Sequence, residues 1–115
     1  MSSITRDRCA GVFAALGDST RLGLVDALAG GLPRSITELS ARSSMTRQAV
    51  TKHLGVLEHA GVVRSRRSGR STFYQLEPDS LRLMRQYLDE VSNQWEDALG
   101  RLKAFVEDDG SSPAG

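Results

Sequence analysis

The chain has 115 residues, of which 39% are hydrophobic and 25% are charged, and its formal net charge is +1. This is the composition of an ordinary globular domain with one modest core, and no apolar run approaches the roughly 18 residues that span a membrane. The start MSSITRDRC lacks an apolar secretory segment, and a single cysteine cannot form an internal disulfide. We therefore expect a soluble cytoplasmic protein with no membrane partner.

The nearly neutral total conceals an uneven distribution of charge. Residues 33–76 carry eight basic and two acidic side chains, a net of +6, whereas residues 77–115 carry four basic and nine acidic ones, a net of −5. Four arginines fall within the seven residues 64–70. Scattered arginines would only keep a surface solvated, but this concentration indicates that the middle of the chain faces a polyanion.

The first third of the chain predicts two helices. The first covers residues 5–16 and ends at Gly17. The second has Ser19 as its expected N-cap and runs to Ala29, where two further glycines stop it. The expected buried stripe of the second helix contains Leu22, Leu24, Val25 and Leu28.

Two short helices follow and are joined by a tight turn. Thr37 is the expected N-cap of the third helix, in which Leu39 points inward. After a turn at residues 43–45, Thr46 caps a fourth helix, residues 46–60, which ends before a glycine. This arrangement resembles a helix-turn-helix, in which the second helix reads bases.

The fourth helix has one apolar face and one polar face. At about 100° per residue, Val50, Leu54 and Leu57 form a stripe that we expect to be buried. His53 lies beside this stripe, where packing and a hydrogen bond across the fold explain it better than metal ligation. The opposite face carries side chains that can bind base edges or phosphates, namely Gln48, Thr51 and Lys52, with Arg47 at the N-terminal end.

Residues 62–76 predict a β-hairpin that turns at Gly69, with strands over 62–68 and 71–76. Because several arginines lie within this hairpin, it is expected to act as a wing that contacts the sugar-phosphate backbone or the minor groove of double-stranded DNA. The predicted DNA-contact residues are Thr46, Arg47, Gln48, Thr51, Lys52, Arg64, Arg66, Arg67 and Arg70.

Pro78 begins the last predicted helix, residues 78–107, because proline is tolerated in a first turn. Its apolar residues step alternately by three and four: Leu81, Met84, Leu88, Val91, Trp95, Ala98, Leu102 and Phe105. This heptad spacing predicts a helix that packs along another helix, and its length of about 40 Å exceeds what the short helices can cover. A second copy of the chain is the simplest partner, and packing across its own core is the alternative. Residues 109–115 are expected to be disordered.

The segments FAALGDSTRLGLVDAL, ITELS and TRQAVTKHLGVLEHAGVVRSRRSGRSTFYQLEP closely resemble the ArsR/SmtB family of bacterial winged-helix repressors. The likeness covers residues 12–78 and implies a mainly α fold with a small β-hairpin wing, formed by a single domain over residues 1–108. It also implies a homodimer that pairs through the first and last helices and represses transcription from an inverted repeat. The implied dimer interface contains Val12, Phe13, Leu81, Met84, Leu88, Val91, Trp95 and Leu102.

The metal ligands that many members of this family use are missing from the sequence. The family's thiolate site places two cysteines after a Glu-Leu pair, but here that pair is followed by Ser40, Ala41 and Arg42. The last helix contains no histidine, and the remaining soft-metal ligands are Cys9, His53 and His59. We therefore predict no metal and no cofactor, and the inducer stays open.

Three other functions fit the sequence less well than DNA binding. A winged-helix module that binds protein or RNA would expose apolar residues on the fourth helix, where Gln48 and Thr51 stand instead. A redox-responsive regulator would use Cys9, which is otherwise a small buried residue of the first helix. An enzyme lacks support, because the sequence shows no nucleophile paired with a base and no phosphate-binding glycine loop.

Overall fold

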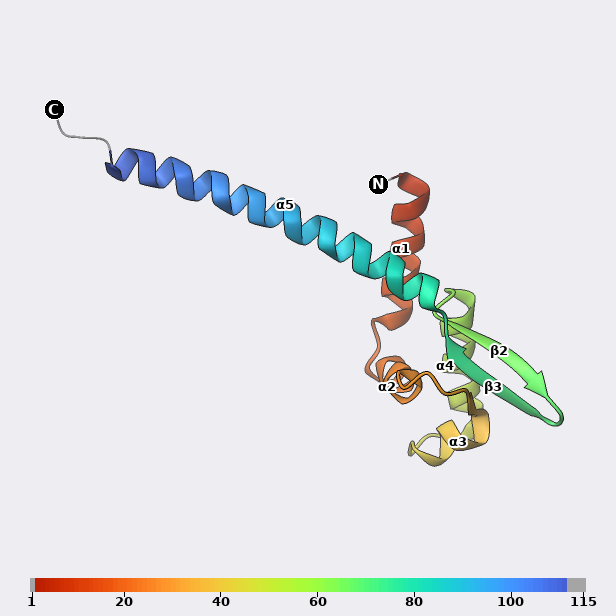
Figure 1. Cartoon of the computed structure of the whole chain (residues 1–115). Coiled ribbons are helices and arrows are strands. Elements are labelled where there is room, and N and C mark those ends of the chain that lie inside the picture. The colour runs from red at the N-terminus through yellow and green to blue at the C-terminus, as the bar shows by residue number, and fades with distance from the viewer. Residues whose placement is uncertain (1, 112–115) are drawn as a thin grey trace. The chain divides into compact units, whose positions relative to one another are not determined.

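A computed structural model describes residues 2–111, within which there are five helices and three strands (Figure 1). In chain order the elements are α1 (Ser3–Leu16), α2 (Ser19–Leu28), β1 (Arg34–Ser35), α3 (Ile36–Ala41), α4 (Arg47–His59), β2 (Val63–Ser68), β3 (Ser71–Leu76) and α5 (Pro78–Ser111). The chain divides into two compact units, one up to Met84 and one from Arg85 onward. The first unit is a winged helix-turn-helix, which confirms the predicted fold class.

The N-cap of α2 is Asp18, one residue before the predicted cap Ser19. One carboxylate oxygen of Asp18 accepts hydrogen bonds from the backbone N–H groups of Thr20 and Arg21, at 2.9 and 3.0 Å. A carboxylate satisfies both free amides and is favoured by the positive end of the helix, which explains why it displaces the serine as cap. The end of the helix, at Leu28, lies one residue before the predicted end.

The N-cap of α3 is Ser35, two residues before the predicted cap Thr37. Ser35 Oγ accepts a hydrogen bond from the backbone N–H of Glu38 at 3.1 Å, and Glu38 Oε1 accepts one from the backbone N–H of Ser35 at 3.3 Å. This reciprocal capping box satisfies two free amides at once. Ser35 also ends β1, a strand that is too short to show the alternation from which strands are predicted.

The three strands form an antiparallel sheet in the order β1-β3-β2. The hairpin register places Ser68 opposite Ser71, so that Gly69 and Arg70 form a two-residue loop. Gly69 has a φ of 62°, and among the described residues only glycines have positive φ. A positive φ at the first loop position alone fits a type II′ turn, which matches the twist of the flanking strands. The predicted hairpin is confirmed, with β1 added beside it.

One hydrophobic core holds the first unit together. Val50, Leu54 and Leu57 are fully buried, as predicted for the apolar stripe of α4. The other buried members of the core are Val12, Ala15, Leu24, Leu28, Leu39, Val62, Val63 and Tyr74. The prediction that Leu22 is buried is wrong, because this side chain is 47% exposed. Two residues along a helix amount to about 200°, so Leu22 lies on the side of α2 away from Leu24.

The long helix α5 begins at Pro78, as predicted, and continues to Ser111. Its 34 residues correspond to about 51 Å at 1.5 Å per residue. The segment 109–115 was expected to be disordered, but its first three residues continue the helix, and residues 112–115 lie outside the described part of the chain. No helix in the described part is both long and apolar enough to cross a bilayer.

Candidate nucleic-acid interface

The polar face of α4 is open to a ligand. The predicted contact residues on this face are all exposed, opposite the buried stripe: Arg47, Gln48, Thr51 and Lys52. The helix begins beside them because Thr46 Oγ1 accepts a hydrogen bond from the backbone N–H of Ala49 at 3.1 Å. The first turn of α4 is exposed, and in a helix-turn-helix the N-terminal residues of the second helix meet base edges.

The hydrogen bonds of the polar face determine which groups remain for a ligand. Thr51 Oγ1 donates to the carbonyl oxygen of Arg47 at 2.8 Å, so Thr51 presents its methyl group and lone pairs outward rather than its proton. Among the described residues, none hydrogen-bonds to the side-chain amide of Gln48. That amide therefore has both a donor and an acceptor free, the pair that matches the edge of adenine.

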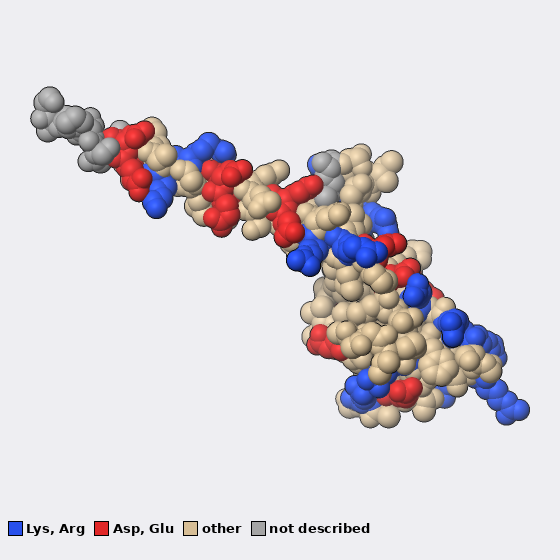
Figure 2. All heavy atoms as spheres, viewed as in Figure 1, with Lys and Arg blue, Asp and Glu red and all other residues tan. Residues whose placement is uncertain are grey.

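The hairpin register distributes the wing arginines over both faces of the hairpin. Arg64 and Arg66 lie on the same face of the hairpin as Phe73, whereas Arg67 lies on the opposite face. Arg70 lies in the loop at the tip. All four arginines are exposed, and Figure 2 shows basic side chains gathered along the hairpin to its tip. The wing presents positive charge on two faces and at its end rather than in a single row.

Two carboxylates hold the base of the wing. Arg64 Nη1 lies 3.2 Å from Glu77 Oε1, so the charge of Arg64 is partly compensated within the protein. Glu58, in the last turn of α4, accepts hydrogen bonds from Ser65 N–H at 3.2 Å and from Ser65 Oγ at 2.5 Å. Because β2 is an edge strand, the Glu58 carboxylate satisfies an amide that faces away from the sheet. In the sequence Glu58 is recognisable only as a negative charge, and no local pattern reveals this link between α4 and the wing.

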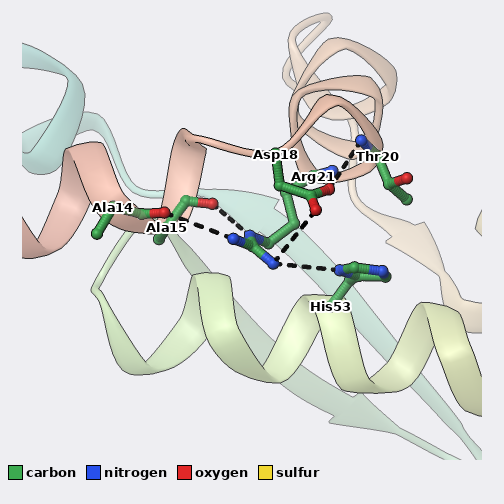
Figure 3. Close-up of polar contacts among 6 residues, drawn as sticks. All are labelled: Ala14, Ala15, Asp18, Thr20, Arg21 and His53. Carbon is green, nitrogen blue, oxygen red and sulfur yellow. Dashed lines mark hydrogen bonds and ion pairs between the residues drawn. The ribbon is translucent and has the colours of Figure 1, made fainter.

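A half-buried guanidinium connects three helices of the first unit (Figure 3). Arg21, in the first turn of α2, donates through Nη1 to His53 Nδ1 of α4 at 3.4 Å. Its Nε donates to the carbonyl oxygen of Ala15, and its Nη2 to that of Ala14 at 3.5 Å, both at the end of α1. Asp18 Oδ2 lies 3.9 Å from Arg21 Nη1. The predicted hydrogen bond of His53 across the fold is confirmed, and Arg21 is the partner that sequence analysis missed.

The groups around Asp18 favour the charged form of its carboxyl. The hydrogen bond from the backbone N–H of Arg21 is the main cause that lowers the pKa of the Asp18 carboxyl, and the positive charge of Arg21 adds to it against the opposing effect of burial. The folded pKa therefore lies below the unfolded value of about 3.9. Ionised Asp18 stabilises the fold above the unfolded value, and this contribution is lost as the pH falls through the folded value.

We expect Asp18→Ala to lower the Tm at pH 7, because α2 loses its cap and Arg21 loses its carboxylate. The difference in Tm between wild type and this variant should shrink as the pH falls below about 4, because the carboxylate is protonated first in the unfolded chain and then, as the pH passes the lower folded pKa, in the folded protein. Thermal unfolding followed by circular dichroism between pH 7 and pH 2.5 measures both effects. Asp26→Ala, at an exposed position of the same helix, is the matched control. A difference that stays constant down to pH 2.5 would show that the Asp18 charge contributes nothing.

The residues predicted for a dimer interface differ in their exposure. Val12 is completely buried in the core of its own subunit, so its assignment to the interface is wrong: this face of α1 packs inward. Phe13 and Met84 are partly buried. The remaining members expose large apolar side chains: Leu81 37%, Leu88 53%, Val91 46%, Trp95 63% and Leu102 59%. Leu99 and Val106 are exposed beside the predicted seam and widen it.

The side chains that were considered as metal ligands or redox groups have ordinary structural surroundings. Cys9 is 2% exposed, as predicted for a small buried residue, and such a thiol has little access to oxidants. His53 binds Arg21, and His59 lies in the exposed last turn of α4. Among the described side chains, no three of His, Cys, Asp or Glu are grouped so that they could hold a metal ion.

Comparisons with known proteins agree with this geometry. A protein-family profile described as a helix-turn-helix domain matches residues 16–66, from the end of α1 into β2. The HTH-type transcriptional regulator Rv2034 of Mycobacterium tuberculosis is 36% identical over 98 residues, which are 85% of this chain and 88% of that protein. The solved ArsR-like transcriptional regulator from Rhodococcus sp. RHA1 has a TM-score of 0.77 and 32% identity, over 88% of this chain and 94% of that one. The chain belongs to the ArsR family of transcriptional regulators.

This ArsR-family regulator is also similar to a solved homodimeric winged helix-turn-helix DNA-binding domain, Mb0332 from Mycobacterium bovis. That domain has a TM-score of 0.64 and 27% identity, over 80% of this chain and 84% of its own. The family predicted from the sequence motifs is therefore confirmed. The protein is a transcriptional regulator with a DNA-binding helix-turn-helix, and its relatives are regulators rather than enzymes.

Proposed function

We propose that this ArsR-family regulator is a sequence-specific repressor that binds an inverted-repeat operator as a homodimer and needs no metal effector. The observation that carries the proposal is that two exposed surfaces, on α4 and on the wing, are joined by hydrogen bonds. The polar face of α4 bears unpaired base-reading groups, and the arginine-rich wing is tied to the end of α4 through Glu58 and Ser65. A single approach to DNA therefore engages both surfaces.

The two surfaces have different tasks in this proposal. α4 enters the major groove, where Gln48 and Arg47 hydrogen-bond to base edges and the Thr51 methyl group contacts thymine. The wing lies over the adjacent backbone or minor groove, where guanidinium groups displace counterions from phosphates. The wing and Lys52 supply most of the affinity, and α4 supplies the preference for one sequence over another.

The apolar stripe of α5 supports the homodimer. Large apolar side chains at heptad spacing are exposed over about five turns, from Leu88 to Phe105. Complete burial of each such side chain is worth about 1.5–3 kcal/mol, so pairing with a second α5 offers a large driving force. The homodimeric state of the related Mb0332 domain agrees with this assembly.

Selection of bound fragments from genomic DNA tests the proposal. The purified protein should enrich fragments that share an inverted repeat, and it should reduce transcription from a template that carries the enriched fragment. The resemblance of the sequence motifs to those of known repressors favours reduced over increased transcription. Enrichment no better than for random fragments would contradict sequence-specific binding, and increased transcription would identify an activator.

Gln48→Ala is expected to weaken binding to the selected operator by about 1–3 kcal/mol and to weaken binding to random duplex much less, because only base contacts distinguish sequences. Fluorescence anisotropy with both duplexes at one salt concentration measures the two effects. Gln86→Ala makes the same change at an exposed position of α5 and should alter neither affinity. Equal losses on both duplexes would exclude Gln48 as a base reader.

A further inference from the structure

Two side chains that the proposed function does not use meet inside the first unit. Arg21 follows the Asp-Ser-Thr run at the start of α2, and His53 lies between Lys52 and Leu54 of α4. They hydrogen-bond to each other although 32 residues separate them in the sequence. We propose that Arg21 is a positioning residue that fixes the rotation of α4 about its axis and thereby sets how well the protein distinguishes its operator from other DNA. This inference rests on the proposed function.

The contacts of Arg21 anchor it on the α1–α2 side (Figure 3). Its side chain is only 17% exposed, and it donates to the carbonyl oxygens of Ala14 and Ala15 in the last turn of α1. The carbonyl oxygen of Ala14 also accepts a hydrogen bond from the backbone N–H of Gly17 at 3.2 Å, and the last turn of α1 carries the negative end of the helix dipole, which favours a cation there. The carboxylate of Asp18 lies beside the same guanidinium. Arg21 is therefore a planar donor that is anchored to α1 through Nε and Nη2, while its Nη1 reaches α4.

The bond to His53 supplies a restraint on α4 that the hydrophobic core does not. Val50, Leu54 and Leu57 are fully buried and hold one face of α4 against the core, but hydrophobic attraction is non-directional and tolerates small rotations. A hydrogen bond is directional and weakens steeply when it bends. It also requires His53 Nδ1 to accept, which places the ring proton of the neutral imidazole on Nε2.

A small rotation of α4 about its axis is enough to weaken the hydrogen bonds between its side chains and base edges. A side-chain tip about 6 Å from the helix axis moves by about 1.5 Å when the helix turns by about 15°. Hydrogen bonds to base edges keep their strength only over a few tenths of an ångström around 2.9 Å. Phosphate contacts from flexible arginines tolerate such a shift. Loss of the Arg21–His53 bond should therefore reduce discrimination more than it reduces affinity for random DNA.

Three substitutions separate the hydrogen bond from packing and charge. His53→Asn keeps an oxygen acceptor near the position of Nδ1, whereas His53→Leu fills the space without an acceptor. Arg21→Lys keeps the charge but loses the planar fork that reaches α1 and α4 together. Arg6→Lys, at an exposed position of α1, is the matched control. The ratio of the dissociation constants for random and operator duplex is measured by anisotropy, together with the Tm of each full-length variant.

We expect His53→Leu and Arg21→Lys to lower this ratio about tenfold, while affinity for random duplex changes less than about twofold. His53→Asn and Arg6→Lys should retain the wild-type ratio within about threefold, and the double variant Arg21→Lys with His53→Leu should be no worse than either single one. A His53→Leu protein that is folded and keeps the wild-type ratio would overturn the inference. If affinity for both duplexes fell by the same factor and the Tm fell with it, Arg21 would only stabilise the fold. That result would also overturn the inference.

The same experiment separates this inference from the proposed function. A wild-type protein that does not distinguish operator from random duplex contradicts both. A wild-type protein that does so, together with unaffected Arg21 and His53 variants, contradicts only the positioning role. If His53→Leu unfolds at the assay temperature, Arg21→Lys and His53→Asn still give opposite expected results, and equal ratios for these two would overturn the inference.

Discussion

The double substitution Leu88→Asp and Val91→Asp is expected to convert the protein into a monomer and to abolish tight operator binding. Both side chains are about half exposed in the single chain, at 53% and 46%, and are available for burial by a partner. Four apolar side chains per dimer would be replaced by charges. At about 1.5–3 kcal/mol each, the loss exceeds about 6 kcal/mol and raises the dimer dissociation constant by more than about four orders of magnitude. Sedimentation equilibrium at micromolar concentration measures the change.

The matched control places the same charges on the opposite side of the helix. Gln86→Asp and Asn93→Asp lie seven residues apart at exposed positions outside the apolar seam, so this double variant should remain a dimer and bind the operator. Circular dichroism should show that both variants retain their helices. A Leu88→Asp, Val91→Asp protein that still sediments as a dimer would disprove the assignment of α5 as the interface.

Removing Arg66 and Arg67 together is expected to weaken binding to operator and to random duplex by similar factors, about tenfold or more at low salt. Each lost phosphate contact should reduce the slope of log K against log salt by about 0.9, so the double variant should lose nearly two units. Replacing Arg64 should have a smaller effect, because Glu77 already compensates its charge. Anisotropy titrations between 50 and 300 mM salt measure the slopes.

A loss of net charge elsewhere should not have the same result. Arg85→Ala with Arg101→Ala removes two exposed arginines from α5 and should leave the salt slope almost unchanged. If either wing substitution altered the preferred sequence without altering the slope, the wing would be reading bases in the minor groove rather than binding phosphates.

The elements of the fold were predictable because their signals are local. The 3.6-residue spacing of Val50, Leu54 and Leu57 gives the buried face of α4, and Gly69 marks the hairpin turn. The wrong boundaries arose where two neighbouring residues can both cap a helix. Asp18 replaces Ser19 because its carboxylate accepts two amide hydrogens at once, which no periodicity reveals.

The exposure of the polar residues that we propose as DNA contacts was also predictable, since each stands opposite a recognisable apolar stripe. Their supports were not predictable, because these connect segments that are distant in sequence. Arg21 meets His53 over 32 residues, and Glu58 meets Ser65 across the joint between helix and wing. Val12 was misplaced for a related reason: the sequence of α1 does not show which of its sides turns toward the core.

In the proposed complex, two copies paired along α5 present their α4 helices to successive major grooves on one side of DNA. Methylation protection of the selected operator tests it most directly, because guanine N7 lies in the major groove. We expect two protected clusters related by two-fold symmetry, with centres about 10 base pairs apart. A single protected cluster, or protection confined to the minor groove, would contradict it.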